Sequence, residues 1–386
     1  MIDLFDPVML ADTVRLNNRI VMAPMTRTRT TDGDIPNALM ATYYGQRASA
    51  GLIVAEATDV APSSKGYART PGIYTEAQRR GWRLVTDEVH RHNGTIFAQI
   101  WHVGRMAHPS LMPNGETPLG VTTQRADGSD VFAHDEEGKL RFVPAGTPRQ
   151  LGTGEVSALV GTFAQAFASA RDAGFDGVEL HAANGYLLEQ FMNSVHNTRT
   201  DCYGGANIKD RTRFLTEVVD AAVRTFGPGR VGVRLSPFGA YNSMPPDPLA
   251  EETLLYLCEE LGQRGVAYIH LLYELLPSGN MESAQFKESH IDHVVLAKVR
   301  AAFPGTIIWC GGFTTRERAQ AALDTGLVDL IAMGRPFIGN PDLVERLRHG
   351  WPIAVADRSS YYTRRGEIGF TDFPAYRDRN PAGAAG

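Results

Sequence analysis

Three polar side chains that could act on a carbonyl compound lie between positions 181 and 186. His181 and Asn184 are three residues apart, so a turn or a first helical turn would place both side chains on one side. Both can donate hydrogen bonds, and negative charge that develops on a carbonyl oxygen requires two convergent donors. Tyr186 adds a hydroxyl that is protonated at neutral pH and can act as an acid. A lone histidine or tyrosine is more often a core residue, so it is the three together that indicate a site.

Two glycine-containing segments, Gly311-Gly312 and Gly334-Arg335, each follow an apolar run late in the chain. Glycines let backbone N–H groups approach an anion, and an arginine can bind the oxygens of the anion. Two tight turns and a surface arginine would explain the same residues without a ligand. If the two runs are the last strands of a barrel, however, this is where a phosphate group commonly binds. The pattern therefore predicts a ligand that carries a phosphate.

Short apolar runs alternate with longer amphipathic segments along most of the chain. Most runs lack the apolar/polar alternation of a half-exposed strand, as expected for parallel strands that are covered on their outer face. Eight strands alternating with helices favour an α/β protein with a single (β/α)8 TIM barrel over a doubly wound sheet, and no G-x-G-x-x-G fingerprint is present. The predicted strands are 19–23, 51–55, 95–100, 177–181, 231–235, 267–272, 306–310 and 328–333.

One long excursion follows the third predicted strand. Residues 102–150 are too many for a simple loop, and the segments 131–134 and 139–143 flank an acidic turn, which predicts a hairpin that forms a lid or cap. A second excursion, 236–248, contains four prolines and is expected to shape the mouth of the barrel. A helix is predicted from the apolar stripe that begins at Val156, and Thr314 with Glu317 predicts the start of another.

Composition excludes several classes of protein. The chain has 386 residues with 38 Lys+Arg against 43 Asp+Glu, a net charge of −5, which argues against a nucleic-acid or anionic-membrane binder. Its three cysteines form no C-x-x-C pair, and we predict no metal site. The absence of a long apolar run and the acidic N-terminus favour a cytoplasmic protein. A chain with a phosphate site but no metal or activated nucleophile is expected to take its chemistry from a bound cofactor.

The chain resembles the old yellow enzyme family, the FMN-dependent ene-reductases, over essentially its whole globular length. The resemblance implies one TIM-barrel domain over residues 1–375, with an N-terminal hairpin, and a flexible tail over 376–386. Thr26 stands where the thermophilic-like subclass has a cysteine, so the chain is similar to the other large subclass, which includes N-ethylmaleimide and pentaerythritol tetranitrate reductases. The motifs that carry the resemblance are at 18–27, 44–53, 99–105, 181–191, 201–205, 233–237, 334–338 and 369–374.

The resemblance implies that FMN is bound at the ends of the strands. The Thr26 hydroxyl would lie near flavin O4, and Gln99 is suited to the pyrimidine edge of the ring. Arg234 would neutralise negative charge near N1 and O2 of reduced FMN. The residues expected to bind FMN are Pro24, Met25, Thr26, Ala57, Gln99, Arg234, Gly311, Gly312, Gly334 and Arg335.

The resemblance also implies a reaction. NADPH or NADH would reduce FMN, and a small activated alkene would then take the place of the nicotinamide in a ping-pong cycle. His181 and Asn184 would bind the substrate carbonyl, and Tyr186 would donate the proton. Nitro-aromatics and nitrate esters are further expected oxidants, and Arg125 and Arg141 are candidates for a 2′-phosphate contact. The expected substrate pocket comprises Thr26, Tyr67, Trp101, His181, Asn184 and Tyr362.

Other interpretations stay open at this point. An FMN barrel oxidase of 2-hydroxy acids would pair its histidine with arginines for a carboxylate, and the Tyr186 donor and the Trp101 wall speak against it. A flavin-binding protein without turnover and a cofactor-free aldolase or isomerase barrel are the others. The segment 273–290 matches no family loop and could alter substrate preference. Either a monomer or a homodimer would suit the sequence.

Overall fold

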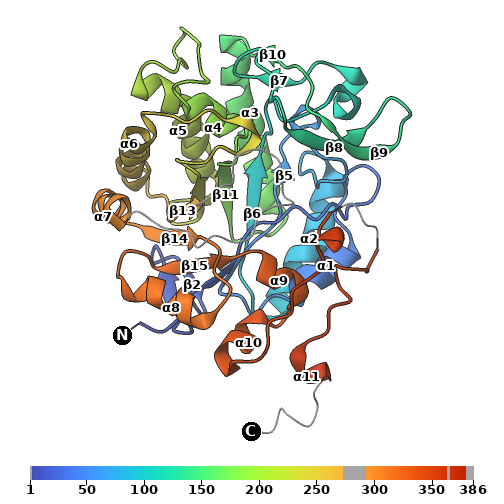
Figure 1. Cartoon of the computed structure of the whole chain (residues 1–386), viewed down its shortest axis with the longest axis vertical. Helices are drawn as coiled ribbons and strands as arrows, with labels where there is room; N and C mark the ends of the chain where they lie inside the picture. Colours follow the sequence, from blue (N-terminus) through green and yellow to red (C-terminus); the bar gives the residue numbers. More distant parts are fainter. Residues whose placement is uncertain (1, 273–292, 363–365, 380–386) are drawn as a thin grey trace.

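The computed structural model describes residues 2–272, 293–362 and 366–379. At its centre, eight parallel strands form a closed barrel with helices around it (Figure 1). The last barrel strand pairs with the first, Ile331 opposite Ile20, and this closes the sheet. All eight predicted strands are present, which confirms the (β/α)8 barrel. In sheet order the strands are β3 (Ile20–Met22), β4 (Leu52–Val54), β6 (Ile96–Trp101), β11 (Gly177–Ala182), β12 (Val231–Leu235), β13 (Tyr268–Leu272), β14 (Thr306–Cys310) and β15 (Leu330–Met333).

Amphipathic helices cover the outside of the barrel. The predicted apolar stripe is the buried face of α3 (Thr153–Asp172), from Val156 to Phe167, and α3 packs against α5 (Ile208–Phe226). The prediction that Thr314 caps a helix is wrong by one residue, because Thr315 has the extended backbone that lets its hydroxyl accept from the N–H of Arg318. The helices are α1 (Ala38–Gly45), α2 (Glu76–Arg91), α3 (Thr153–Asp172), α4 (Leu187–Met192), α5 (Ile208–Phe226), α6 (Ala250–Gln263), α7 (His293–Ala302), α8 (Arg316–Asp324), α9 (Arg335–Gly339), α10 (Leu343–His349) and α11 (Tyr376–Arg379).

The barrel interior is filled by apolar side chains at the N-terminal end of the strands. Phe97 and Tyr268 pack there with the expected N-terminal hairpin, which is formed by β1 (Val8–Leu10) and β2 (Val14–Leu16). Gly232 makes room for Tyr268, because a Cβ at position 232 would lie 2.0 Å from the Tyr268 ring. The interior is thus a packed core at this end, and polar groups are concentrated toward the other end.

The long excursion after β6 contains the predicted hairpin. β8 (Asp130–His134) pairs in antiparallel fashion with β9 (Leu140–Pro144), and Figure 1 shows this hairpin beside the barrel at the upper right. Two further short strands, β7 (Leu119–Gly120) and β10 (Arg149–Gln150), form a parallel pair at the base of the excursion. The excursion therefore has secondary structure of its own.

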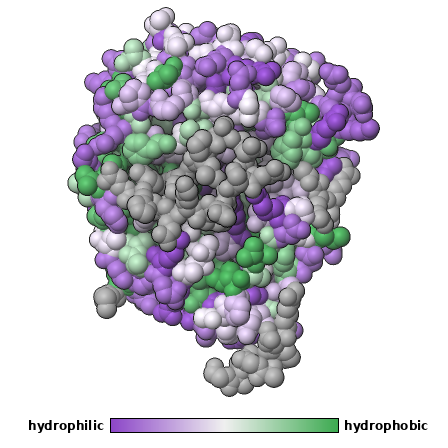
Figure 2. Space-filling view, in the orientation of Figure 1, coloured by the Kyte–Doolittle hydropathy of each residue, from purple (hydrophilic) through white to green (hydrophobic). Residues whose placement is uncertain are grey.

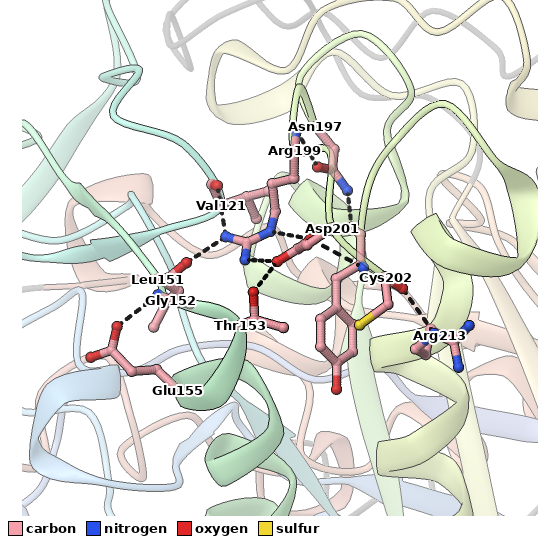
Figure 3. Close-up of polar contacts among 11 residues, drawn as sticks. Val121, Leu151, Gly152, Thr153, Glu155, Asn197, Arg199, Asp201, Cys202 and Arg213 are labelled. Atoms are coloured by element: carbon pink, nitrogen blue, oxygen red, sulfur yellow. Dashed lines mark hydrogen bonds and ion pairs between the residues drawn. The ribbon is translucent and has the colours of Figure 1, made fainter.

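A buried arginine in the loop between α4 and α5 holds this excursion (Figure 3). Arg199 donates to the carbonyl oxygens of Val121 and Leu151, the residues that directly follow β7 and β10 at the same end of this parallel pair. The same guanidinium forms an ion pair with Asp201, and the hydroxyl of Thr153 donates to that carboxylate over 2.6 Å. Because the guanidinium donors of Arg199 are divided between the backbone that follows β7, the backbone that follows β10 and Asp201 in its own loop, loss of Arg199 would loosen the contact between the excursion and this loop.

Several predictions fall outside the described residues. These are the unmatched segment 273–290 and most of the predicted tail, although residues 376–379 form α11. No helix among the described residues has the length and apolarity that crossing a membrane requires. On the face shown in Figure 2, hydrophobic residues form small groups among hydrophilic ones.

Candidate active site

An aromatic cluster forms at the C-terminal ends of β6 and β11. The indole of Trp101 and the imidazole of His181 lie parallel, with ring centroids 6.0 Å apart. Tyr186 meets both rings edge to face, at 4.8 Å from Trp101 and 4.9 Å from His181. Tyr67 stacks on Trp101, and the Tyr186 hydroxyl lies 3.3 Å from the Tyr67 hydroxyl. The fold therefore brings together three of the residues predicted to shape the pocket, Tyr67, Trp101 and His181, and the predicted proton donor Tyr186.

Asn184 is presented by a left-handed turn rather than by a helical one. β11 ends at Ala182 and α4 begins at Leu187, and between them Asn184 has φ 61° and Gly185 has φ 74°. Asparagine tolerates this conformation better than most residues, and glycine has no Cβ to obstruct it. A Cβ at Gly185 would also lie 2.6 Å from the carbonyl oxygen of Tyr241. Of the two alternatives that the sequence left open, a turn and a first helical turn, the structure has the turn.

A hydrogen-bond chain from the next loop holds this turn in place. The N–H of Asn184 donates to the Ser236 hydroxyl over 2.8 Å, and that hydroxyl donates to Glu189 over 2.9 Å. The N–H of Gly185 donates to the other Glu189 oxygen. The side-chain amide of Asn242 donates to the Asn184 carbonyl oxygen over 2.7 Å. The backbone groups of the left-handed turn cannot form helical hydrogen bonds, and side chains provide their hydrogen-bond partners instead.

The electrostatics of the site favour a neutral imidazole and a protonated phenol. Burial, with the positive charges of Arg234 and His270, holds the pKa of His181 well below its usual range. Burial, followed by the neighbouring phenol of Tyr241, raises the pKa of Tyr186 above its usual value. Nδ1 of His181 and Oδ1 of Asn184 are buried without a hydrogen-bond partner among the described residues. Such orphaned polar atoms are expected where a ligand completes the site.

A buried polar network lies below the aromatic cluster, inside the barrel. The carboxylate of Glu179 accepts from Gln99 over 2.7 Å, and the phenol of Tyr268 donates to it over 3.0 Å. The ring of His270 lies 2.8 Å from the same carboxylate. Arg234 faces this network and lies 3.8 Å from the sulfur of Cys310.

Sequence reasoning missed Glu179 and His270 in this network. The signal was a charged residue two positions before His181 in an otherwise apolar strand, since residues two apart share one face of a strand.

The residues expected to bind FMN follow neighbouring strands of the barrel. Pro24, Met25 and Thr26 come after β3, Ala57 after β4, and Gln99 lies in β6, and these strands are adjacent in the sheet. The two glycine segments follow β14 and β15, which are also neighbours. Arg234 is 6% exposed, and its Nε has no hydrogen-bond partner among the described residues. An unpaired guanidinium nitrogen, backbone donors at two adjacent strand ends and an aromatic wall fit a flavin that carries a phosphate.

Two further tyrosines belong to the same region. Burial raises the pKa of Tyr67 well above its usual range, and the phenols of Tyr186, Tyr241 and Tyr362 add to that effect, so all of them lie nearby. Tyr241, from the proline-containing excursion, was not singled out from the sequence.

The two arginines considered for a 2′-phosphate contact form ion pairs with other residues, Arg125 with Asp127 and Arg141 with Asp135.

Comparison with known proteins identifies the family of this chain. The model of the NADH:flavin oxidoreductase / NADH oxidase family matches residues 3–353. The chain belongs to this family. It is an NAD(P)H-dependent ene-reductase of the old yellow enzyme type, and its cofactors are FMN and a nicotinamide coenzyme.

Two plant reductases match this chain over most of their own length and most of its length. 12-Oxophytodienoate reductase 1 of Oryza sativa subsp. japonica is 40% identical over 364 residues, which cover 94% of this chain and 90% of the relative. 12-Oxophytodienoate reductase 2 of Arabidopsis thaliana is 40% identical, over 93% of this chain and 92% of the relative.

Solved structures share the fold of this ene-reductase. Morphinone reductase in complex with tetrahydroNAD superposes with a TM-score of 0.90 at 42% identity, covering 98% of this chain and 99% of that one. The old yellow enzyme homologue from Zymomonas mobilis has a TM-score of 0.87 at 35% identity, covering 96% of this chain and 99% of that one. Family membership also argues against a cofactor-free aldolase or isomerase barrel.

Proposed function

We propose that this ene-reductase reduces the C=C bond of α,β-unsaturated carbonyl compounds, with NADPH or NADH as the reductant. The observation that carries the proposal is the orthogonal arrangement of His181 and Tyr186, whose ring centroids are 4.9 Å apart. It sets a carbonyl-binding ring and a protonated phenol around one small volume. Trp101 closes that volume on a further side.

His181 and Asn184 are proposed to bind the substrate carbonyl oxygen. A neutral imidazole donates one hydrogen bond, and the low pKa of His181 keeps it in that form across the physiological pH range. Asn184, in the left-handed turn that follows the strand of His181, would supply the second donor. Negative charge develops on the carbonyl oxygen as the β-carbon is reduced, so each donor is expected to lower the barrier by roughly 3 kcal/mol.

Tyr186 is proposed to deliver the proton to the α-carbon. Its raised pKa keeps the phenol protonated at neutral pH, and Tyr67 and Asn242 lie against its hydroxyl. Bound FMN would supply the hydride chemistry, alternating between the nicotinamide and the alkene in a ping-pong cycle. Delivery of the proton from the face opposite the hydride would give net trans addition of hydrogen.

We assign FMN binding to the strand-end residues described above. Arg234 would stabilise negative charge on the pyrimidine edge, because it is buried and has an unpaired nitrogen. Gln99 would contact that edge while Glu179 orients its amide. Gly311, Gly312, Gly334 and Arg335 would hold the phosphate, and Pro24, Met25, Thr26 and Ala57 would line the ring.

An anaerobic visible spectrum tests the proposal in three steps: as purified, after one equivalent of NADPH, and after addition of 2-cyclohexen-1-one. Flavin bands that bleach with NADPH and return with the enone support it. Bands that bleach and do not return would contradict enone reduction, and the nitro-aromatic and nitrate-ester classes would be tried next. Bands that never bleach would indicate a flavin-binding protein without turnover. A cytoplasmic location and a monomeric or homodimeric state also belong to the proposal, and fractionation and size-exclusion chromatography test them.

A further inference from the structure

A buried carboxylate contacts the aromatic wall of the pocket from behind. Asp59 lies in β5 (Thr58–Asp59), a short strand beside β6, directly opposite Trp101. Its Oδ1 accepts the indole N–H of Trp101 over 2.7 Å, and its Oδ2 accepts the hydroxyl of Thr70 over 2.7 Å. The side chain is 1% exposed. Both oxygens therefore have a neutral donor, and one of these donors is a pocket residue.

A carboxyl group is a costly choice at this position. Burial raises the pKa of Asp59 to about 7. The positive charge of Lys65 offsets this only in part, and Lys65 itself forms an ion pair with Asp34 over 2.5 Å. Uncompensated burial of an acid destabilises a fold, and an apolar residue would avoid that cost. The buried acid does, however, give the indole N–H a strong and directional acceptor.

Trp101 is the ring on which the other pocket rings converge. It stacks on His181 and on Tyr67, and it meets Tyr186 edge to face. The indole is 1% exposed, so its orientation decides how much space lies beside the proposed carbonyl anchor and proton donor. Rotation of the indole about its side-chain bonds would break the contact with Asp59 and change the shape of that space at once.

We propose that Asp59 is a positioning residue that fixes the Trp101 indole and thereby determines which substituents next to the alkene the pocket accepts. The claim about substrates rests on the proposed function. The claim about the orientation of the indole rests on geometry alone. With Asp59 in place, the indole keeps one orientation, and a substituent on the α-carbon meets a rigid wall. Without it, the indole can turn, and the wall yields to the larger substrate.

The test compares Asp59→Ala with Asp59→Asn, which keeps a carbonyl oxygen for the indole N–H. Thr70→Val is the matched control, because it removes the other donor to Asp59 and leaves the indole contact intact. The first readout is near-ultraviolet circular dichroism, where the Trp101 component is the difference between wild type and Trp101→Phe. We expect Asp59→Ala to lose most of that component, and Asp59→Asn and Thr70→Val to retain it.

The second readout is the ratio of kcat/KM for 2-methyl-2-cyclohexen-1-one to that for 2-cyclohexen-1-one. A pocket wall that rejects a methyl group lowers kcat/KM for the methylated substrate by about tenfold or more. Asp59→Ala should therefore raise the ratio by at least about fivefold. Asp59→Asn and Thr70→Val should stay within about twofold of wild type. An unchanged ratio and an unchanged dichroism component in a folded Asp59→Ala would overturn the inference.

The two proposals can fail separately. If wild type reduces neither enone, the proposed function fails, and the dichroism comparison still decides whether Asp59 orients Trp101. If Asp59→Ala does not fold, Asp59→Val replaces it, since valine also lacks an acceptor and fills nearly the same volume. In that variant too, retention of the Trp101 component would refute the inference.

Discussion

The N–H of Asn184 donates to the hydroxyl of Ser236 over 2.8 Å, a contact between residues 52 positions apart. It joins the loop after β11 to the loop after β12, and through Ser236 it reaches the carboxylate of Glu189. The left-handed turn that presents Asn184, a proposed carbonyl anchor, is therefore supported from a neighbouring strand end. Local sequence alone would leave that turn free to adopt other conformations.

This relationship predicts the behaviour of Ser236→Ala. Loss of the hydroxyl leaves the Asn184 N–H without its acceptor, a loss that costs about 1–3 kcal/mol for a buried group. We expect phenolic ligands, which resemble the enolate oxygen, to bind about tenfold more weakly. Spectral titration of the flavin measures this affinity. FMN content should be unchanged, and a variant that binds phenols normally would show that Ser236 does not support the anchor.

Substitution of His181 by alanine should weaken phenol binding more directly. Because the pKa of His181 lies well below its usual range, the ring is neutral at both pH 6 and pH 8. The contribution of His181 to affinity should therefore be the same at the two pH values. Titration of wild type and His181→Ala at each pH gives the comparison. A contribution that grows as the pH falls would indicate a protonated ring and contradict this assignment.

Tyr186→Phe separates the two half-reactions. General acid catalysis is typically worth 10²–10⁴-fold, so alkene turnover should fall by about a hundredfold or more. Reduction of the flavin by NADPH involves no proton from the phenol and should keep its rate. Anaerobic stopped-flow absorbance follows each half-reaction. Loss of the flavin from the variant would instead show that Tyr186 is structural.

Arg234→Ala should weaken FMN binding, with Arg234→Lys as the control that keeps the charge. The guanidinium is nearly buried and has an unpaired nitrogen, so its removal takes away a charge-assisted contact. Such contacts are worth about 1.5–3 kcal/mol, which corresponds to roughly a tenfold to hundredfold rise in the FMN dissociation constant. Flavin fluorescence on dilution measures it. Equal affinity for FMN in wild type and Arg234→Ala would show that Arg234 does not bind the flavin.

Glu56 predicts a pH dependence of stability. Burial raises the pKa of this carboxyl to about 7, although the Arg27 N–H and the Tyr44 hydroxyl contact it. The folded state therefore holds a proton that the unfolded state releases between about pH 4.5 and pH 7, so stability falls as the pH rises through that range. Glu56→Gln removes the titrating carboxyl and with it this contribution to the pH dependence of stability. Denaturant unfolding at pH 5 and pH 7.5 should show a smaller decrease for the variant, by on the order of 2 kcal/mol. An equal decrease in both proteins would contradict the raised pKa.

Local sequence patterns predicted a large part of the fold. The eight apolar runs predicted the barrel strands because a parallel strand covered on both faces has to be apolar along its length. The hairpin at β8 and β9 was equally visible, since two extended segments flank an acidic turn. The cap of α8 was misplaced by one residue, because Thr314 and Thr315 both carry a hydroxyl and only backbone geometry selects between them.

The candidate site was only partly predictable. Residue types identified His181, Asn184 and Tyr186, and the resemblance to old yellow enzymes identified Trp101 and Tyr67. The sequence held no signal for the approach of Asp59 to the Trp101 indole, because that contact depends on β5 lying beside β6. Tyr241 was missed for a similar reason, since its place depends on the path of the proline-containing excursion.

The sequence by itself determined the strands, the helices between them and the chemical groups available at the strand ends. Those features follow from periodicity and side-chain chemistry, which act over a few residues. Only the tertiary structure decided that the barrel closes between β15 and β3 and that Ser236 supports Asn184. Closure and support are contacts between distant segments, and their geometry exists only once the whole barrel has packed.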